Sequence, residues 1–320
     1  MKSSSENETV LASDSSATSL QPRQARSIDA AIGSPIGIIA GNGTFPIAVV
    51  QRLNELGFRT IVIGHKGETN PEIEKIASEC EWVRVGQLGK IISTLKRHGI
   101  RFVAFAGGIS RVKLFGGARL DWRAIRLIAR LGTVKDDVLL RGIAEELAHS
   151  GLEVFGAAQV LDRSIAEAGL LTRRGLGVQE LADARIGWEA AKGIGALDIG
   201  QTVVTFEGVV VAVEAVDGTD ATIRRAGDLT KRPKVGTFLP FGSAGSSGAV
   251  VVKVCKPQQD ERLDLPTVGG QTIDSMVAAG ATALVVEAGR TLILDWDEVV
   301  TIANSAGISI LAVSELQQIR

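Results

Sequence analysis

The chain has 320 residues, 45% of them hydrophobic, so it is long enough for two domains with buried cores. Its formal net charge is −1, which argues against a nucleic-acid-binding protein, because such proteins carry an overall basic excess. The two cysteines, Cys80 and Cys255, are far apart and lack metal-ligand spacing, so we expect buried thiols in a reducing compartment.

The first 34 residues differ in composition from the rest of the chain. They are rich in Ser, Ala, Gln and Asp and lack the apolar core of a secretory signal. No segment reaches the roughly 18 uninterrupted apolar residues that a membrane span needs. We therefore expect residues 1–34 to form a disordered tail and the protein to stay in the cytoplasm.

From Pro35 onward, short apolar runs alternate with segments of helical periodicity. The predicted strands of the first half are residues 36–40, 60–63, 82–85, 102–106 and 153–158. The predicted helices are residues 45–56, 71–77, 88–97, 122–131 and 136–149. Strands separated by helices are typical of βαβ units, so we predict a Rossmann-like α/β domain with a parallel sheet over residues 35–165.

A polar, glycine-flanked stretch then indicates a linker, at residues 166–177. The predicted helices after it are residues 178–194, 218–226, 271–279 and 296–304. The predicted strands are a hairpin at 202–216 that turns at Glu207-Gly208, residues 249–254, a strand pair at 283–287 and 292–294, and residues 308–313. A loop is predicted at 231–248. We predict a second α/β domain, which carries the catalytic residues, at 178–320, with a substrate cleft between the two domains.

A glycine turn, Gly41-Asn42-Gly43, connects the first predicted strand to the next helix. Exposed backbone N–H groups and the helix dipole favour an anion at such a turn, and glycines let a ligand approach closely. Pro46 stands where a dinucleotide-binding fingerprint has its third glycine, so the pattern is a weak indication of an NAD site. The turn predicts either an anion or nucleotide contact or an ordinary tight βα turn.

Gly107-Gly108 ends the fourth predicted strand, where open α/β sheets collect ligands. Arg111 and Lys113 follow and are candidates for phosphate binding or for solvated loop cations. Asp136 and Asp137 open a predicted helix, where acidic side chains commonly cap the N-terminus. The three histidines share no metal-ligand or catalytic spacing, and we expect them to be structural surface residues.

The most polar part of the second half lies at residues 214–272. Glu214 and Asp220 stand at a strand end and the following turn, and Arg225 comes one helical turn later. Eight basic residues occur at 224–262, although the whole chain is nearly neutral. Carboxylates hold Mg²⁺, the metal activates water and cations neutralise phosphate oxygens, so the pattern suits phosphoryl chemistry. The alternative is a solvated loop region of mixed charge.

Four stretches of the chain together resemble the UDP-2,3-diacylglucosamine pyrophosphatases of the LpxI type. They are residues 37–43 (GIIAGNG) with Phe45-Pro46, residues 136–140 (DDVLL), residues 213–215 (VEA) running into 218–220 (GTD), and residues 256–262 (KPQQDER) with 264–267 (DLPT) and Gly269. Residues 285–289 also fit. The resemblance extends from about Pro35 to the C-terminus, and the order and separation of the motifs make it specific.

The resemblance implies hydrolysis of the diphosphate of UDP-2,3-diacylglucosamine to UMP and 2,3-diacylglucosamine 1-phosphate, the lipid X of lipid A biosynthesis. It implies Mg²⁺ as the cofactor, with Mn²⁺ as the alternative ion. It also implies two α/β domains with the substrate between them, a homodimer, and contact of this cytoplasmic protein with the inner membrane surface.

The essential aspartate of the family's Gly-Thr-Asp motif falls on Asp220. We expect Asp220 to bind the metal or to position the attacking water, with Asp264 and Glu214 as further metal ligands. Arg225 and Lys253 are expected to act in catalysis by steadying the diphosphate. The substrate contacts expected from the same motifs and from the first domain are Gly41, Asn42, Gly43, Gly107, Gly108, Arg111, Asp137, Thr219, Lys256, Gln259, Arg262, Thr267 and Thr272.

Two other functions remain open at this stage. An NAD(P)-dependent oxidoreductase needs an acidic residue at the end of the second strand to bind a ribose, and Gly64-His65-Lys66-Gly67 stands there instead. A non-catalytic nucleotide- or lipid-binding protein would have the same fold. It would bind its ligand tightly without turnover or metal dependence.

Overall fold

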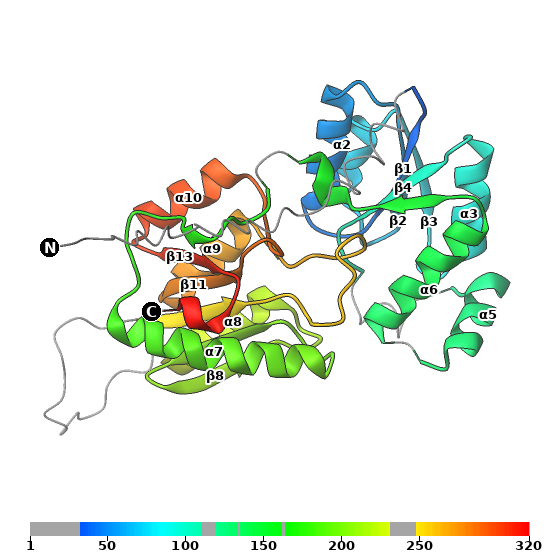
Figure 1. Ribbon diagram of the computed structural model, residues 1–320. Coiled ribbons are helices and arrows are strands. Elements are labelled where there is room, and N and C mark those ends of the chain that lie inside the picture. The colour runs from blue at the N-terminus through cyan, green and yellow to red at the C-terminus, as the bar shows by residue number, and fades with distance from the viewer. Residues whose placement is uncertain (1–32, 110–118, 134, 162–163, 231–247, 320) are drawn as a thin grey trace, which may run out of the picture.

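The computed structural model describes residues 33–109, 119–133, 135–161, 164–230 and 248–319, which form two α/β domains (Figure 1). The fold class predicted from the sequence is confirmed. The predicted tail, apart from Gly33 and Ser34, and the predicted loop at 231–248, apart from Gly248, lie outside the described residues.

The N-terminal domain is built on one parallel sheet. Its elements in chain order are β1 (Ile36–Ala40), α2 (Phe45–Glu55), β2 (Thr60–His65), η1 (Pro71–Lys75), β3 (Glu79–Val83), α3 (Leu88–Arg97), β4 (Phe102–Ala106), α5 (Trp122–Leu131), α6 (Asp136–His149), β5 (Glu153–Phe155) and η2 (Ala157–Val160). The strand order is β3-β2-β1-β4-β5 and every pair is parallel. The order reverses between β1 and β4, and a sheet of this kind binds ligands beyond the carboxyl ends of those strands.

Both faces of this sheet are buried, which explains its nearly continuous apolar strands. On one face, Val49 and Leu53 of α2 pack against Ile38 and Phe102. On the other face, α3, α5 and α6 cover the sheet through a second apolar cluster. Leu263, from the C-terminal half of the sequence, is a member of that second cluster.

The C-terminal domain contains a mixed sheet and a separate two-stranded one. Its elements are β6 (Gly169–Leu170), α7 (Val178–Ala196), β7 (Thr202–Phe206), β8 (Val209–Val213), α8 (Thr219–Thr230), β9 (Ala249–Lys253), β10 (Thr267–Val268), α9 (Gly270–Ala279), β11 (Ala281–Glu287), β12 (Leu292–Ile293), α10 (Trp296–Ser305), β13 (Ser309–Val313) and η3 (Leu316–Gln318). The larger sheet has the order β6-β13-β11-β9-β7-β8. Its central strands β9, β11 and β13 are parallel, and the outer strands are antiparallel to their neighbours.

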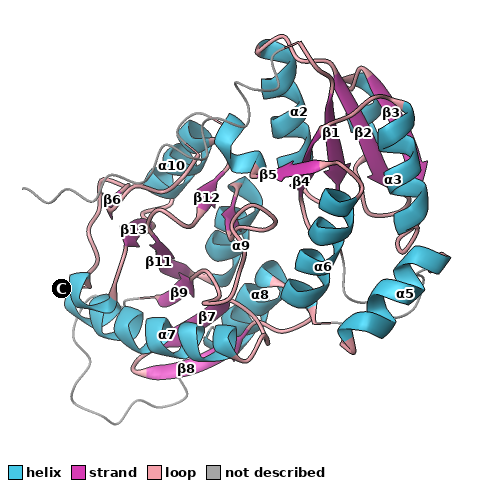
Figure 2. Cartoon of the chain, turned by 45° about the vertical axis from the view of Figure 1, so that its right-hand side comes forward, coloured by secondary structure: helices cyan, strands magenta, loops and turns pink. Residues whose placement is uncertain are grey.

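Helices cover both faces of the larger sheet as well. Trp188 of α7 belongs to the apolar cluster on one face, and Ile223, Ile273 and Val299 of α8, α9 and α10 belong to the cluster on the other. Figure 2 shows α7 and α10 on opposite sides of β11 and β13. Because β9 and β11 are parallel, their carboxyl ends lie at the same edge of the sheet. The helices α8, α9 and α10 begin at this edge.

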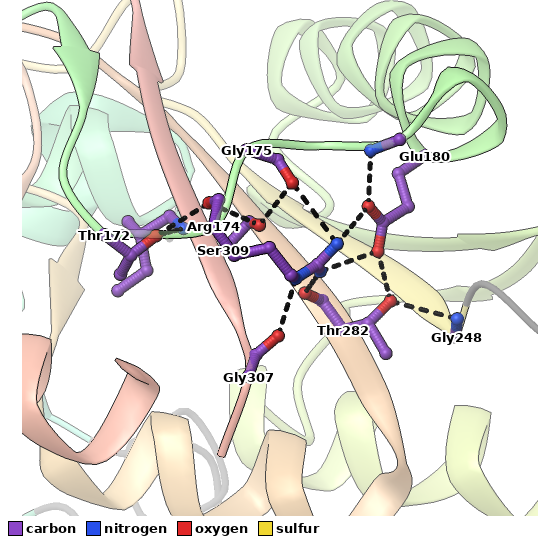
Figure 3. A network of polar contacts seen from close by, with 10 residues as sticks. Thr172, Arg174, Gly175, Glu180, Gly248, Thr282, Gly307 and Ser309 are labelled. Carbon is purple, nitrogen blue, oxygen red and sulfur yellow. Dashed lines mark hydrogen bonds and ion pairs between the residues drawn. The ribbon is translucent and has the colours of Figure 1, made fainter. Parts of the chain in front are cut away.

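The segment before α7 is held by an ion pair between a half-exposed Arg174 and a buried Glu180 (Figure 3). Both guanidinium nitrogens of Arg174 bond the carboxylate of Glu180 at 2.8 Å, and Arg174 Nε donates to the carbonyl of Gly307 at 2.7 Å. Burial alone would raise the pKa of Glu180, but the hydrogen bonds from Arg174, Thr282 and Gly177 outweigh burial and lower that pKa. The network joins the start of the C-terminal domain to β11 and β13.

Three predicted strands differ from the structure. The third strand is Glu79–Val83 instead of 82–85, and the fifth ends at Phe155, because Ala157–Val160 forms a 3₁₀ turn. The strand at Leu292–Ile293 pairs with β10 and not with β11. In the described residues, no helix combines the length and the apolar character that crossing a lipid bilayer requires.

Candidate active site

A polar cavity of about 610 Å³ lies where the two domains meet. The N-terminal domain contributes the turns that follow β1 and β4, and the C-terminal domain contributes the starts of α8, α9 and α10 with the end of β9. The residues that line it are Asn42, Gly43, Thr44, Phe45, Gly107, Gly108, Thr219, Asp220, Lys253, Leu263, Asp264, Leu265, Thr267, Gly269, Gly270, Gln271, Thr272, Leu294, Asp295 and Glu298. It brings together ten of the predicted site residues: Asn42, Gly43, Gly107, Gly108, Thr219, Asp220, Lys253, Asp264, Thr267 and Thr272.

The glycine turns of the N-terminal domain pack on each other. Asn42 N donates to the carbonyl of Gly108 at 2.8 Å, and Gly41 N donates to that of Ala106 at 2.7 Å. A Cβ atom on Gly41 would lie 2.2 Å from the carbonyl oxygen of Gly108, which is impossible without moving the backbone. The contact between the two turns therefore requires glycine at position 41, and Gly41 also lines an apolar cavity of about 230 Å³ beside the polar one.

The starts of four helices border the cavity. Residues 42–45 precede and open α2, Thr219 and Asp220 open α8, residues 269–272 open α9, and Asp295 with Glu298 opens α10. No side-chain hydrogen bond caps α2, α9 or α10. Because first-turn N–H groups lack partners within the helix and the dipole is positive at that end, these starts favour anionic groups in the cavity.

Asp220 and Lys253 bring opposite charges to the cavity wall. Asp220 Oδ1 is buried and has no hydrogen-bond partner among the described residues. Lys253 is buried at the end of β9, where its Nζ donates to Thr219 Oγ1 at 3.0 Å and to the carbonyl of Thr267 at 2.8 Å. In the described part of the chain, no carboxylate pairs with Lys253, so its positive charge is available to an anion in the cavity.

Glu214 lies behind this wall and does not line the cavity, which corrects its prediction as a metal ligand. Its Oε1 accepts a hydrogen bond from Thr219 Oγ1 at 2.9 Å, and its Oε2 accepts one from the backbone N–H of Gln201 at 3.2 Å. Both carboxylate oxygens are thus occupied. Glu214 orients Thr219, and Thr219 in turn accepts from Lys253.

Asp264 is a partly buried carboxyl group on the cavity wall. Burial raises its pKa, whereas the charge of Lys256 and a hydrogen bond from Gln259 act in the opposite direction. Gln259 Nε2 donates to Asp264 Oδ2 at 2.6 Å, and Gln259 Oε1 accepts from Lys256 N at 3.1 Å. Gln259 therefore holds Asp264 in place and does not itself line the cavity.

Lys256 and Asp137 form a buried junction between the domains. Lys256 Nζ lies 3.3 Å from Asp137 Oδ1 of α6 and 2.7 Å from Asp198 Oδ1. Burial alone would lower the pKa of Lys256, but the two carboxylates raise it above its ordinary value. Because its charge is neutralised there, Lys256 joins the domains and does not reach the cavity, where we had predicted substrate contacts for it and for Asp137.

The remaining predicted arginines also lie elsewhere. Arg225 pairs with Asp217 on the exposed side of α8, and its Nη2 donates to the carbonyl of Val213 at 2.8 Å. Arg262 pairs with Asp260 at 2.7 Å and borders a separate cavity of about 480 Å³. Neither lines the polar cavity. Arg111 lies outside the described residues.

Sequence reasoning missed Asp295 and Glu298. Asp295 has a positive φ of 51° and immediately precedes α10, and Glu298 belongs to the first turn of that helix. The signal was present, since residues 292–294 form a short apolar run followed by an acidic residue and a helix. This is the same strand-to-helix arrangement that singled out Gly41-Asn42-Gly43.

The carboxylates of the cavity fit the predicted magnesium site only in part. Among the described residues, no group of three or more His, Cys, Asp and Glu side chains is placed to hold a metal ion. The predicted set of Asp220, Asp264 and Glu214 is therefore not assembled. Asp220 and Asp264 do line the same cavity, and the unpartnered oxygen of Asp220 fits a cation. Two carboxylates suffice for Mg²⁺, which usually keeps several waters.

An apolar cavity of about 230 Å³ adjoins the polar one, and the two share Gly107, Gly108, Leu263 and Asp264. It lies between the N-terminal sheet and the helices α3, α5 and α6. The apolar side chains that line it are Ile39, Val85, Leu88, Ile91, Phe105, Ile109, Leu120, Ala124, Leu127, Ile128, Leu139, Leu140, Ile143 and Leu263. A ligand that occupied both cavities would have a polar, anionic part and an apolar part.

His65 also borders the apolar cavity and is buried, which corrects its expected place on the surface. Its Nδ1 lies 2.8 Å from the carbonyl of Ala40, and burial lowers its pKa. Burial raises the pKa of Cys255 to about 12 and that of Cys80 to about 11, so neither thiol is a nucleophile at neutral pH.

The fold and the cleft define a two-domain α/β protein in which a polar cavity between the domains adjoins an apolar one. Residues 35–164 match the family model of the LpxI N-terminal domain, and residues 167–311 match that of the LpxI C-terminal domain. A relative from Caulobacter vibrioides, named UDP-2,3-diacylglucosamine pyrophosphatase LpxI, is 34% identical over 281 residues, which are 87% of this chain and 97% of the relative. The chain therefore belongs to the LpxI family of enzymes, and the family predicted from the sequence is confirmed.

Similarity to solved structures is weak. The biotin carboxylase domain of a single-chain bacterial carboxylase is 15% identical, over 49% of this chain and 35% of that chain, with a TM-score of 0.23. UDP-glucose 4-epimerase from Thermotoga maritima, solved with UDP-glucose, is 11% identical, over 45% of this chain and 42% of that chain, with a TM-score of 0.26. At these TM-scores neither likeness bears on the fold or the function of this chain.

Proposed function

We propose that this chain hydrolyses the diphosphate of UDP-2,3-diacylglucosamine to UMP and 2,3-diacylglucosamine 1-phosphate. The observation that carries the proposal is the contact between the two cavities, because this substrate has a charged nucleotide half and an apolar half that carries two acyl chains. Family membership and the name of the Caulobacter relative support the same substrate.

The diphosphate would lie in the polar cavity. There the starts of α2, α8, α9 and α10 present N–H groups and dipoles to its oxygens, and Lys253 supplies a full positive charge. Because Lys253 is buried and Thr219 and the carbonyl of Thr267 hold its ammonium group, its position is fixed before the substrate arrives. Pre-placed charges of this kind stabilise the negative charge that builds up as the anhydride bond breaks.

Asp220 is the residue proposed to orient the attacking water. Its unpartnered Oδ1 can accept a hydrogen bond from that water and can take its proton as the oxygen attacks phosphorus. The phosphorus–oxygen bond to the leaving phosphate then breaks, and Lys253 stabilises the charge on that phosphate. In its alternative role Asp220, together with Asp264, would hold Mg²⁺, or Mn²⁺ in its place, which when bound polarises the phosphoryl group and lowers the pKa of water.

The apolar cavity would take acyl carbons of the glucosamine half, because each methylene that leaves water for such a cavity stabilises binding. Leu263 and Asp264 border both cavities, so the sugar would lie beside them. In keeping with the family resemblance, the proposal includes a homodimer that works in the cytoplasm at the inner membrane surface.

The test is release of UMP from UDP-2,3-diacylglucosamine by the purified chain with Mg²⁺. We expect release that EDTA abolishes and that added Mg²⁺ or Mn²⁺ restores. Tight binding of the substrate without UMP release, over several acyl lengths, would contradict the proposal and favour the non-catalytic binding protein.

A further inference from the structure

Helix α5 leaves an apolar surface exposed. Trp122 and Ile125 of this helix are 75% and 46% exposed, and Leu120, just before the helix, is 44% exposed. The opposite side of the same helix is buried: Ala124 and Leu127 pack in the core of the N-terminal domain and line the apolar cavity. One short helix thus separates the cavity from an apolar surface that faces water.

Arginines flank this apolar surface. Arg119, Arg123, Arg126 and Arg130 occur in a stretch of twelve residues whose single acidic member is Asp121, whereas the chain as a whole has a net charge of −1. A helix with Trp and Ile on one side and arginines beside them is typical of helices that lie in the interface of an anionic bilayer.

The acidic groups near α5 neutralise only its two ends. Asp121 caps the start of the helix, and Arg130 pairs with Glu146 of α6 at 3.1 Å. Among the described residues, no carboxylate lies within ion-pair distance of Arg123 or Arg126. Two positive charges beside Trp122 and Ile125 are therefore left for an external anion.

The helix is also accessible to a large partner. In both views α5 lies at the outer end of the N-terminal domain, away from the sheet of the C-terminal domain (Figures 1 and 2). A flat surface can reach it there without touching the second domain. The apolar cavity begins directly beneath, at Leu120 and Ala124.

We infer that α5 docks the protein on an anionic lipid bilayer, with Trp122 and Ile125 among the lipid headgroups and Arg123 and Arg126 on lipid phosphates. This inference rests on the proposed function, because it identifies the side from which a diacylated substrate passes from the bilayer into the apolar cavity. Apolar burial and attraction to anionic lipid add up at such a helix.

Sedimentation with phosphatidylglycerol vesicles tests the inference. We expect the parent chain to bind these vesicles, and the double variant Trp122→Ser/Ile125→Ser to bind at least ~10-fold more weakly. Arg123→Ser and Arg126→Ser should each weaken binding about five-fold. Val178→Ser is the matched control, since Val178 is 89% exposed on α7 in the other domain and its loss should change nothing.

Two measurements separate this inference from the proposed function. The double variant should unfold at the parent's temperature and release UMP from substrate in detergent micelles at the parent's rate, but release it several-fold more slowly from vesicles. Vesicle binding without any UMP release in micelles would contradict the proposed function alone. A parent chain that does not bind phosphatidylglycerol vesicles would overturn the docking role. A parent dimer that the double variant abolishes would assign α5 to contact between copies and would overturn it as well.

Discussion

The two adjoining cavities differ in the kind of interaction that each offers. The polar cavity relies on a few fixed groups, chiefly Asp220, Lys253 and the starts of the helices, which act in defined directions. The apolar cavity relies on many interchangeable carbon contacts, no one of which is directional. Single substitutions should therefore be severe in the first and graded in the second.

The largest expected effect is that of Asp220→Asn. The amide keeps the size of the side chain but cannot take a proton, so kcat should fall at least ~10²-fold, as for other single groups that stabilise a transition state. Initial rates of UMP release measure this, and the melting temperature checks the fold. A variant that keeps more than a tenth of the parent's kcat would remove Asp220 from its proposed role.

Filling the apolar cavity should change the choice of acyl chain. Ala124→Phe places a ring among the lining residues, and each methylene that it displaces costs about 0.8 kcal/mol, or about four-fold in kcat/KM. Loss of two methylenes would lower kcat/KM for the longest substrate about fifteen-fold and leave shorter ones less affected.

Ala306→Phe is the control for Ala124→Phe, because Ala306 is an exposed residue of the C-terminal domain that lines neither cavity. An equal loss of kcat/KM for substrates with short and long acyl chains would show that the cavity does not bind the acyl group. The distinction between the two cavities would then lose its functional meaning.

Thr219 tests how well the polar cavity is preorganised. Thr219→Val keeps the shape of the side chain but removes the hydroxyl group that joins Glu214 to Lys253. Hydrogen bonds to charged groups contribute about 1.5–3 kcal/mol, so kcat should fall about 10- to 100-fold. Thr219→Ser restores the hydroxyl and should restore most of the rate. If the Ser variant is as slow as the Val variant, the hydroxyl is not what positions Lys253.

Glu180→Gln should leave both cavities intact and affect stability alone. Loss of the charged hydrogen bonds to Arg174 should lower the free energy of unfolding by about 2 kcal/mol at neutral pH. The pKa of Glu180 is lowered in the folded chain, so its contribution is present above the carboxyl group's ordinary pKa and is lost as the pH falls through the folded value.

Denaturant titrations of the parent and of Glu180→Gln should therefore converge in acid. Glu189→Gln, at an exposed position of the same helix, is the matched control. Its free energy of unfolding should equal that of the parent both at neutral pH and in acid. A gap that persists below the folded pKa of Glu180 would mean that packing, and not charge, stabilises this contact.

Strand and helix positions were largely predictable, because buried positions are apolar and their spacing in the sequence follows the period of the strand or helix. β1, β4 and β9 are buried along their whole length and appear as apolar runs, which in β9 end at Lys253. β3 was misplaced because it is an edge strand whose first four residues are only half-buried, so its run is not apolar. The two-residue strands β6 and β10 were missed, since so short a segment has no periodicity.

Site residues were predictable only where their place at the end of a strand or the start of a helix brings them to the cavity. Asn42, Gly107 and Asp220 follow strands or open helices, and the sheet brings such residues to one edge. Lys256 and Arg225 were chosen for their charge, and the structure pairs them with carboxylates. The partner Asp137 lies 119 residues from Lys256 in the sequence, and a single sequence does not show such a pairing.

Leu263 connects the two halves of the molecule through an apolar contact. It belongs by sequence to the C-terminal half, yet it packs with Ile91 and Leu127 in the core of the N-terminal domain. Swinging the domains apart would expose it to water at a cost of about 1.5–3 kcal/mol. A closed arrangement of the domains would therefore outnumber arrangements in which Leu263 is exposed by about ten-fold or more.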